Sequence, residues 1–446
     1  MYIIIVGAGE VGYNLAKLLS YEGHDIIVID RDPDRYAHVA ETLDVKAVLG
    51  NGTSYTVLEQ AGIRSAHLLT AVTTNDEVNL IAAYMAKRYG VARTVARVKN
   101  PEFLHPDSPI NPQKFGIDLI IHPESETARA AIMLLRQTAA TDVLEFCNGE
   151  VDLIGIQLDE SCPILHIPLK DLARRYENLV FRTIAIQRKE ITRIPSGDDV
   201  FLPNDRIFVI TKKSLVAEVI RLAGKENEKI ENVMILGGGQ IGYLIARELE
   251  KELNVKVIES SVDRSRTLAE KLGGSLVIQG DGRDLNLLAA EGIIDMDAFI
   301  AATGDDETNI ISCLLAKHLQ VPRIISLINK PAYTPILPSI GINAYISKQM
   351  ITVNGILKFI RRGEILSVAS IPGIAAEAIE MIPREGSKIT RRPLAELHFP
   401  KHAILGAVMR NGEVFIPVGD TQIQAGDKVV LFALPSAIRE VEKFFN

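Results

Sequence analysis

Short apolar runs alternate with longer amphipathic stretches through the first part of the chain. Residues 2–6 are an apolar run, and residues 9–19 then place apolar side chains at helical spacing. Residues 25–29 and 33–43 repeat this order, with a proline in the first turn of the second expected helix. Further strands are expected at residues 46–49, 67–72, 94–98 and 119–121. The alternation predicts a doubly wound parallel α/β sheet.

The same pattern recurs 230 residues later in the chain. GAGEVG at 7–12 is matched by GGGQIG at 237–242, GNG at 50–52 by GDG at 280–282, and TTNDEVN at 73–79 by TGDDETN at 303–309. A smaller repeat follows each copy, with PSGD at 195–198 matched by PVGD at 417–420. The chain is therefore predicted to contain two large and two small domains in alternation.

The repeat predicts a fold class and a set of boundaries. We expect two Rossmann-like doubly wound parallel sheets, each followed by a small α+β domain whose strands in the first copy include residues 151–158, 179–187 and 206–211. The polar residues 224–229 have the composition of a linker. The expected domains are residues 1–138, 139–224, 230–362 and 363–446.

The glycine motif has the context of a dinucleotide site, because it follows a strand, opens a helix and precedes an acid at the end of the next strand. Gly7 permits the tight turn, Gly9 allows a pyrophosphate to approach the backbone, and Gly12 allows close helix packing. Asp30 lies 23 residues beyond Gly7 and is expected to accept hydrogen bonds from ribose hydroxyls. A carboxylate there repels a 2′-phosphate, so NAD(H) is favoured over NADP(H).

Other candidate ligand contacts follow the later strands, where a doubly wound sheet binds its ligand. These candidates are Asn51, Gly52, Thr73, Thr74 and Arg97. The alternative is that these loops are ordinary turns that use Gly and Asn for their geometry. The second copy retains the glycines and an acid, Glu259, but has Leu327 at the position of Arg97. A degenerate second site, with different affinity or ligand, is therefore an open alternative.

Composition narrows the functional class. The 49 basic and 56 acidic residues give a net charge of −7, which argues against a nucleic-acid-binding protein. No apolar run is long enough for a membrane-spanning helix. The three cysteines form no C-x-x-C pair, as expected in a reducing cytoplasm. No Ser–His–Asp, Cys–His or paired-carboxylate set occurs in both copies, and no metal site is expected. These features favour a ligand sensor over an enzyme, with an NAD-dependent oxidoreductase as the alternative.

The motifs together resemble one family. GAGEVG with Asp30, GNG at 50–52, AVTTNDEVN at 71–79, VARVKNPEF at 95–103 and the GGGQIG copy resemble the TrkA family, the peripheral subunits of Trk-type potassium uptake systems. The resemblance covers the whole chain and implies two RCK (KTN) nucleotide domains, each with an RCK C-terminal domain. It implies regulation and not catalysis: NAD(H) as ligand, ATP or ADP as regulatory ligands, and a cytosolic gating ring, commonly a homotetramer. The partner would be a TrkH/TrkG-like membrane potassium-transporter subunit contacted from the cytoplasmic face of the cell membrane. A regulator of another cation transporter is the remaining alternative.

The resemblance also assigns nucleotide contacts. In the first copy they are Gly7, Ala8, Gly9, Glu10, Val11, Asp30, Asn51, Gly52, Thr73, Thr74 and Arg97. In the second copy they are Gly237, Gly238, Gly239, Gln240, Ile241, Glu259, Asp281, Gly282, Thr303 and Gly304.

Overall fold

The computed structural model describes residues 1–21, 23–105, 108, 111–176, 179–189, 191–342, 344–360, 365–370, 374 and 376–445. Packing divides the chain into two compact units, Met1–Glu126 with Gln349–Arg362, and Thr127–Lys348 with Gly363–Asn446. Each unit combines two segments that are far apart in the sequence, so the units do not correspond to consecutive domains of the chain. The domain boundaries expected from the repeat therefore remain predictions, and the one expected at 362–363 lies outside the described residues.

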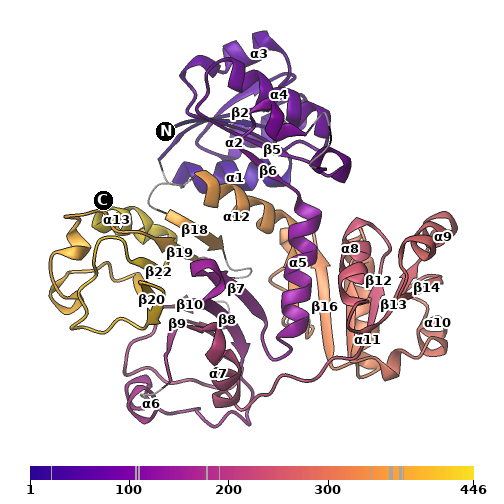
Figure 1. Cartoon of the computed structure of the whole chain (residues 1–446), viewed down its shortest axis with the longest axis vertical. Helices are drawn as coiled ribbons and strands as arrows, with labels where there is room; N and C mark the ends of the chain where they lie inside the picture. The colour runs from indigo at the N-terminus through magenta and orange to yellow at the C-terminus, as the bar shows by residue number, and fades with distance from the viewer. Residues whose placement is uncertain are drawn as a thin grey trace. The chain divides into compact units, whose positions relative to one another are not determined.

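The first unit contains a parallel sheet of the expected topology (Figure 1). Its strands are β1 (Tyr2–Val6), β2 (Asp25–Asp30), β3 (Lys46–Leu49), β4 (Leu68–Ala71), β5 (Arg93–Arg97) and β6 (Leu119–Ile121), in the order β3-β2-β1-β4-β5-β6. Its helices are α1 (Glu10–Tyr21), α2 (Pro33–Thr42), α3 (Tyr55–Gln60) and α4 (Asp76–Arg88). The strand order reverses between β1 and β4, which places the switch point at the carboxyl end of β1.

Alternating residues of β1 serve the two faces of this sheet. Ile3 and Ile5 pack in one core cluster with Leu15 of α1, whereas Ile4 and Val6 pack in another with residues of α3 and α4. All four strand residues are at most 2% exposed. A strand covered on both faces must be apolar throughout, and this is why the chain begins with an unbroken apolar run.

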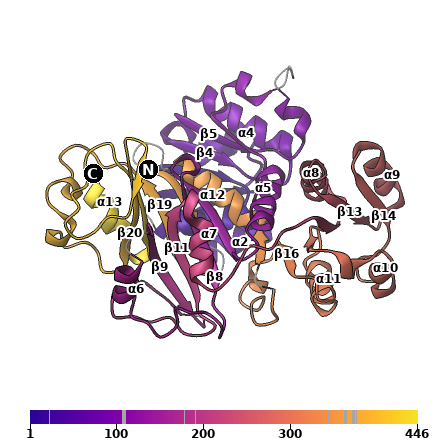
Figure 2. The same ribbon diagram turned by 60° about the horizontal axis from the view of Figure 1, so that its bottom comes forward.

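The second unit repeats this sheet, and Figure 2 shows β13 and β14 with α9 beside them. The strands are β12 (Asn232–Leu236), β13 (Asn254–Glu259), β14 (Ser275–Gln279), β15 (Ala298–Ala301), β16 (Arg323–Ile328) and β17 (Ala344–Ser347), in the order β14-β13-β12-β15-β16-β17. The helices are α8 (Gln240–Leu249), α9 (Val262–Lys271), α10 (Leu285–Ala290) and α11 (Asp306–His318). The expected fold class, two doubly wound parallel sheets, is confirmed.

The helix that follows each sheet packs with the other copy. Helix α12 (Lys348–Ile360) follows β17, yet its residues Val353, Ile356 and Leu357 share a core cluster with Ile3 of the first sheet. Figure 1 shows α12 directly beside α1. The Arg93 guanidinium, at the start of β5, donates to the carbonyl oxygen of Ile360 at 2.5 Å and so caps this helix.

The reciprocal cap is made by Arg323, at the start of β16. Helix α5 (Pro123–Arg136) follows β6, and the Arg323 guanidinium donates to the carbonyl oxygens of Leu134 at 2.7 Å, Thr138 at 2.8 Å and Ala140 at 2.8 Å. Arg323 is only 8% exposed, and burial lowers its pKa to about 10. Arg93 and Arg323 occupy equivalent positions, so the two copies exchange their last helices by the same device.

The two small domains each contain an antiparallel five-stranded sheet. The first has β7 (Asp142–Phe146), β8 (Val151–Gln157), β9 (Phe181–Arg188), β10 (Ile191–Arg193) and β11 (Arg206–Lys212), with α6 (Leu169–Arg175) and α7 (Val216–Leu222). The second has β18 (Ile365–Ser370), β19 (Glu377–Met381), β20 (Ala403–Arg410), β21 (Glu413–Phe415) and β22 (Lys428–Ala433), with α13 (Ile438–Phe445). This confirms the expected α+β class of the small domains.

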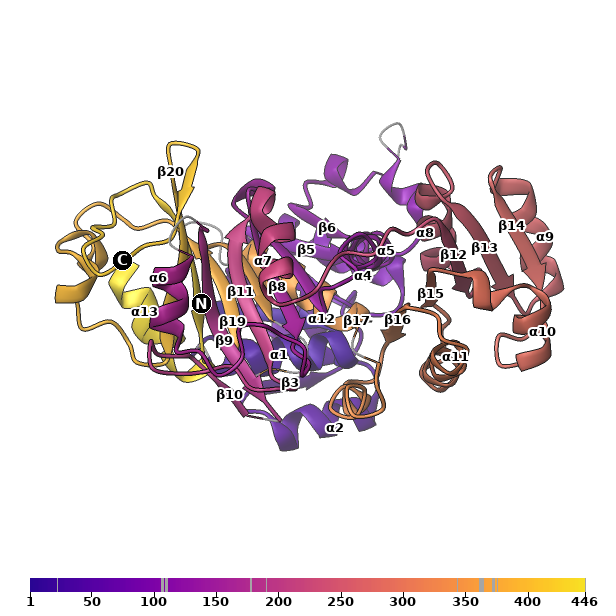
Figure 3. The same ribbon diagram turned by 90° about the horizontal axis from the view of Figure 1, so that it is seen from below.

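The two small domains pack against each other through their sheets (Figure 3). Phe208 and Ile210 of β11 share a core cluster with Val430 and Phe432 of β22. A Cβ on Gly406 would collide with the side chain of Ile210, so the sheets approach closely at this point. Among the described residues, every helix lacks the length or the apolar character needed to cross a membrane.

Replacing Arg323 with alanine should leave buried carbonyl groups of the α5 terminus without donors. We expect Arg323→Ala to lower the free energy of unfolding by about 3 kcal/mol, measured by urea denaturation. The matched Arg93→Ala, at a less buried position, should lower it by about 1 kcal/mol. Equal and small losses in both variants would contradict the structural role given to Arg323.

A second prediction concerns Asp152 of β8, which is 2% exposed and whose Oδ1 accepts no hydrogen bond from the described residues. Burial raises the pKa of Asp152 to about 6, with a further rise from Glu145 and an opposing effect from Lys213. A raised pKa in the folded state means that stability is lost as the pH rises through about 6.

Asp152→Asn should therefore raise the free energy of unfolding at pH 7 by about 2 kcal/mol, and this advantage should vanish below a pH of about 4, where Asp is protonated in both states. Urea denaturation at both pH values is the measurement. The exposed Glu150→Gln serves as the control and should show no such pH dependence. An Asp152→Asn variant that is less stable than wild type at pH 7 would contradict the prediction.

Candidate functional site

The glycine-rich turns lie at the carboxyl ends of β1 and β12. Gly7 has φ of +106° and Gly237 has φ of +101°, which is backbone geometry that glycine adopts readily. A Cβ on Gly12 would collide with the carbonyl oxygen of Gly7, so the first turn of α1 must approach the strand closely. Gly242 and Gly237 make the same approach in the second copy.

The middle glycine of each turn faces open space. A Cβ on Gly9 would meet only the Arg35 Nη1, at 3.6 Å, and a Cβ on Gly239 would meet nothing within 4 Å. Backbone N–H groups at the start of a helix are therefore accessible to an anion at this point, as in sites that hold a pyrophosphate. Glu10 and Val11 in the first copy, and Gln240 and Ile241 in the second, form the first turns of α1 and α8.

A carboxylate lies beside each turn. Asp30 ends β2, and its Oδ2 accepts from the Ala8 N–H at 2.5 Å while its Oδ1 accepts from the Asp32 N–H at 2.9 Å. Glu259 ends β13 and accepts in the same way from the N–H groups of Gly238 and Ser261. The structure therefore brings both predicted acids to the switch point, next to the glycine turn.

Glu259 has an additional partner. Its Oε1 accepts from the Arg264 Nη2 at 2.7 Å, and its side chain is 3% exposed. Burial raises the pKa of Glu259, but the Arg264 guanidinium and the two backbone N–H donors outweigh this and hold the pKa below its usual value.

The loops after the third strands are held against the central strands. A Cβ on Gly52 would collide with the Val6 side chain, and one on Gly282 would collide with Leu236. Asn51 Oδ1 accepts from the Thr53 N–H at 3.0 Å. Its counterpart Asp281 forms an ion pair with Arg283 at 2.8 Å.

Asn79 organises the loop after β4, a role that its position in the motif alone did not predict. Its Oδ1 accepts from the Thr73 N–H at 2.9 Å and from the Thr73 hydroxyl at 2.7 Å, and its Nδ2 donates to the Arg97 carbonyl oxygen at 2.9 Å. Asn309 makes the same contacts with Thr303 and Leu327. Both TTNDEVN at 73–79 and TGDDETN at 303–309 end in this Asn, and this recurrence was the signal in the sequence for its role.

The fifth strands differ between the copies. Burial lowers the pKa of Arg97, against the opposing effects of Glu124 and Asp76, and its Nε has no hydrogen-bond partner among the described residues. A guanidinium with unused donors is suited to a phosphate or another anion. Leu327, 5% exposed, replaces this cation in the second copy.

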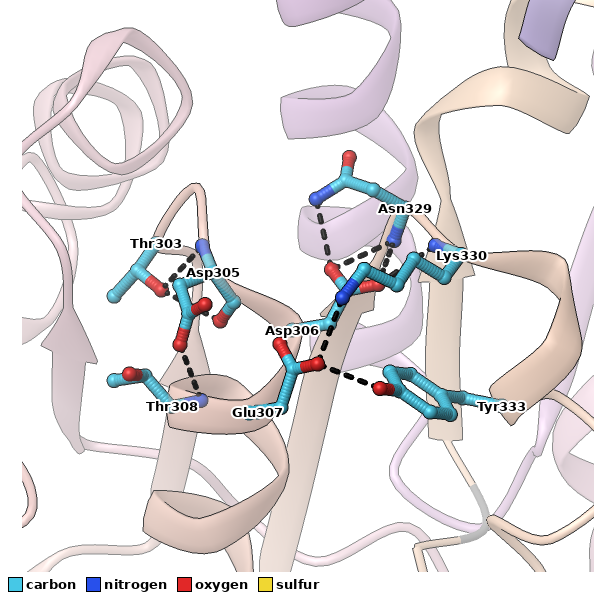
Figure 4. Close-up of polar contacts among 8 residues, drawn as sticks. All are labelled: Thr303, Asp305, Asp306, Glu307, Thr308, Asn329, Lys330 and Tyr333. Atoms are coloured by element: carbon cyan, nitrogen blue, oxygen red, sulfur yellow. Dashed lines mark hydrogen bonds and ion pairs between the residues drawn. The ribbon is translucent and has the colours of Figure 1, made fainter.

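A polar cluster lies beside the second site (Figure 4). Asp306 accepts from the backbone N–H groups of Asn329 and Lys330, as Asp76 does from those of Lys99 and Asn100 in the first copy. Glu307 forms an ion pair with Lys330 at 2.7 Å and accepts from the Tyr333 hydroxyl at 2.5 Å. The hydrogen bond from Lys330, followed by that from Tyr333, lowers the pKa of Glu307 to about 2.

The remaining predicted residues lie in the same loops. Thr74 accepts at its carbonyl oxygen from the Lys99 Nζ at 3.0 Å. Gly304 faces open space, whereas a Cβ on Gly238 would collide with the side chain of Leu268. Ala8, at the position of Gly238, is 6% exposed.

Two domain families match the chain in tandem. The TrkA-N domain matches residues 3–123 and 233–348, and the TrkA-C domain matches residues 153–224 and 379–446. The chain belongs to the TrkA family. This membership confirms the resemblance seen in the sequence motifs.

TrkA-family relatives match over their full length. Trk system potassium uptake protein TrkA of Azorhizobium caulinodans is 36% identical over 452 residues, covering 100% of this chain and 99% of that protein. The TrkA protein of Halomonas elongata is 36% identical over 451 residues, with the same coverage. These relatives carry the name of a potassium uptake protein and not of an enzyme, which confirms the expectation of a non-enzymatic protein.

Solved structures with the fold of this TrkA-family chain come from the GsuK channel. The GsuK RCK domain has a TM-score of 0.61 at 17% identity, covering 100% of this chain and 94% of that chain. The structure described as the GsuK channel bound to NAD has a TM-score of 0.61 at 18% identity, covering 100% of this chain and 78% of that chain. At this identity the likeness shows the fold. The individual nucleotide contacts in both copies stay predictions.

The glycines of the TrkA-N motif should differ in their effect on folding. Gly12→Ala should lower the free energy of unfolding by about 2–3 kcal/mol, because its methyl group collides with a backbone carbonyl. Gly9→Ala faces open space and should cost less than about 1 kcal/mol. Urea denaturation of both variants is the measurement, and equal losses would contradict the close approach at Gly12.

Proposed function

We propose that this TrkA-family chain is a cytosolic nucleotide-sensing regulatory subunit of a Trk-type potassium uptake system. It binds NAD(H), with ATP or ADP as further regulatory ligands, and gates a TrkH/TrkG-like membrane subunit from the cytoplasmic face. The observation that carries the proposal is the first switch point. There an open glycine turn and a carboxylate lie at the carboxyl ends of neighbouring strands, with an arginine at the end of β5, in a chain of this family.

The first site suits a dinucleotide in three respects. The N–H groups around Gly9 bind the pyrophosphate, because a Cβ on Gly9 would meet nothing within 4 Å except the Arg35 Nη1. Asp30 accepts from the ribose hydroxyls, since each of its oxygens has lone-pair capacity beyond its one backbone donor. Arg97 places a positive charge at the end of β5, which favours a phosphate nearby. When bound, the nucleotide acts as a ligand, and no chemical step on it is required.

The solved relatives in fold support the choice of ligands. One GsuK structure is described as bound to NAD and another, with a TM-score of 0.52, as bound to ADP. An adenosine moiety is common to both, and it would meet the same glycine turn and carboxylate in this chain. The proposal therefore extends the nucleotide ligands of that fold to the first site here.

Gating requires that ligand binding favours one arrangement of the chain over another. Strand β5 connects the nucleotide site to a helix of the other copy. Arg97 lies at its carboxyl end, and Arg93, which caps α12, lies at its amino end. A nucleotide that engages Arg97 thereby acts on the strand that holds a helix of the other copy. Assembly as a homotetrameric gating ring would pass this change to the membrane subunit.

The proposal predicts selective loss of nucleotide binding in an Asp30 variant. Asp30→Ala should weaken NADH binding at least about tenfold by removing a charged acceptor from the ribose hydroxyls. Isothermal titration calorimetry of the purified chain measures it. Asp34→Ala removes an exposed acid from the first turn of α2 and is the matched control. Equal NADH affinity in Asp30→Ala and wild type would contradict the assigned contact.

Transport provides the second arm of this test. Cells that lack the chain should lose regulated potassium uptake, and wild type should restore it better than Asp30→Ala. NADH absorbance should stay constant during incubation with the chain. A sustained, substrate-dependent fall in absorbance would favour the oxidoreductase instead, and unchanged uptake in the deletion strain would exclude the regulatory role.

A further inference from the structure

The two nucleotide sites of this chain differ at the carboxylate that faces the ribose. We propose that Arg264 closes the second site by an internal ion pair with Glu259, so that this site binds nucleotide more weakly than the first and accepts a ribose only when Arg264 leaves. The inference rests on the proposed nucleotide binding at the first site.

Arg264 and Arg35 occupy the same position in the two copies. Asp32 is the N-cap of α2 and Ser261 is the N-cap of α9, and each arginine is the third residue after its cap. Arg35 lies with its Nε 3.8 Å from Asp32 Oδ2 and its Nη1 beside Gly9. Arg264 instead donates to Glu259 at 2.7 Å. One arginine therefore lies along the glycine turn, and the other lies on the acid.

Two substitutions between the copies account for this difference. Glu259 is one methylene longer than Asp30, so its Oε1 reaches out to the guanidinium while Oε2 still accepts from the backbone of the turn. The N-cap of the first copy is Asp32, whose carboxylate attracts Arg35, whereas the cap of the second is Ser261, which carries no charge. Both changes favour the pair in the second copy alone.

The pair occupies one of the two Glu259 oxygens that a ribose could use. Its Oε1 already accepts from the Ser261 N–H at 2.8 Å and from Arg264, and its Oε2 accepts from the Gly238 N–H at 2.9 Å. The Glu259 side chain is 3% exposed, and a ribose hydroxyl that uses Oε1 must displace the guanidinium paired with it. Ribose hydroxyls are neutral donors, which form weaker hydrogen bonds to a carboxylate than a cation does.

Other cations around the second site are also neutralised. Arg283 is paired with Asp281 and Lys330 with Glu307, each by a carboxylate of the same site. The first copy has Thr53 and Asn100 at the positions of Arg283 and Lys330, and keeps Arg97 where the second has Leu327. Since the two added cations are already paired, the absence of a counterpart to Arg97 is the difference that a phosphate meets in the second site.

Exchanging aspartate and glutamate between the two sites, at Asp30 and Glu259, tests the proposal directly. Calorimetric titration of wild type with NADH, and separately with ATP, should give one tight site per chain and a second at least about tenfold weaker. Glu259→Asp should withdraw the acid from Arg264 and strengthen the second site about fivefold, the range expected for a partly exposed ion pair. Asp30→Glu should create the pair with Arg35 and weaken the first site by a similar factor.

Arg264→Ala tests the same contact at an exposed position where folding is not at risk. In an Asp30→Ala background, which weakens the first site, it should strengthen binding at the second site, whereas the neighbouring exposed Arg266→Ala should leave that binding unchanged. The pair can also be tested without nucleotide. A double-mutant cycle measures the coupling between Glu259 and Arg264 from the free energies of unfolding of the single and double variants. It should give a favourable coupling that the Asp30–Arg35 cycle lacks.

The outcomes separate this inference from the proposed function. Absence of NADH and ATP binding at any site of wild type would overturn the proposed function and this inference with it. A tight first site together with an equally tight second site would overturn this inference alone. Weakening of the second site by Arg264→Ala would do the same, because it would make Arg264 a ligand contact and not a competitor.

Discussion

The close approach of Gly12 to the carbonyl group of Gly7 is the constraint on which the first site depends. It seats the first turn of α1 on the end of β1 and so directs the helical N–H groups toward the switch point. Once the turn has that position, the Ala8 N–H meets Asp30 and Gly52 packs on Val6. The second copy builds its turn on the same contact, between Gly242 and Gly237. The two sites thus share one backbone design and differ only in the side chains placed around it.

Much of this architecture could be read from the sequence because its signals are local. The strands Tyr2–Val6, Lys46–Leu49 and Leu119–Ile121 have the same bounds as the apolar runs that predicted them. The glycine spacing located both turns. The exchange of α5 and α12 was not predicted. Helical periodicity shows that a helix has a buried face but not which of two similar sheets it meets, so it did not show which copy α12 covers or which copy caps α5. The same limit applies to Arg264, since a sequence shows that an arginine follows an N-cap but not whether the neighbouring acid is long enough to hold it.

Divergence between the copies follows a simple pattern. The residues that fix backbone geometry are retained, including both glycine turns and the Asn79 and Asn309 contacts. Several side chains around the ligand position have changed, with Arg97 replaced by Leu327 and with charged pairs added around the second turn. These side chains can change without loss of the fold, because the backbone of the turn does not depend on them.

Because the helices are exchanged, neither half of the tandem chain has all the contacts that it needs when taken alone. A polypeptide that ended at the linker would have no α12 to cover Ile3 and Ile5, and its own α5 would have no Arg323 to cap it. Two such polypeptides could cover and cap each other's exposed groups by exchanging helices in a domain-swapped dimer. Its formation would carry the entropic cost of bringing separate molecules together. Covalent linkage removes that cost and makes the exchange independent of protein concentration. It also frees each half to change its sequence alone, which a pair of identical polypeptides cannot do.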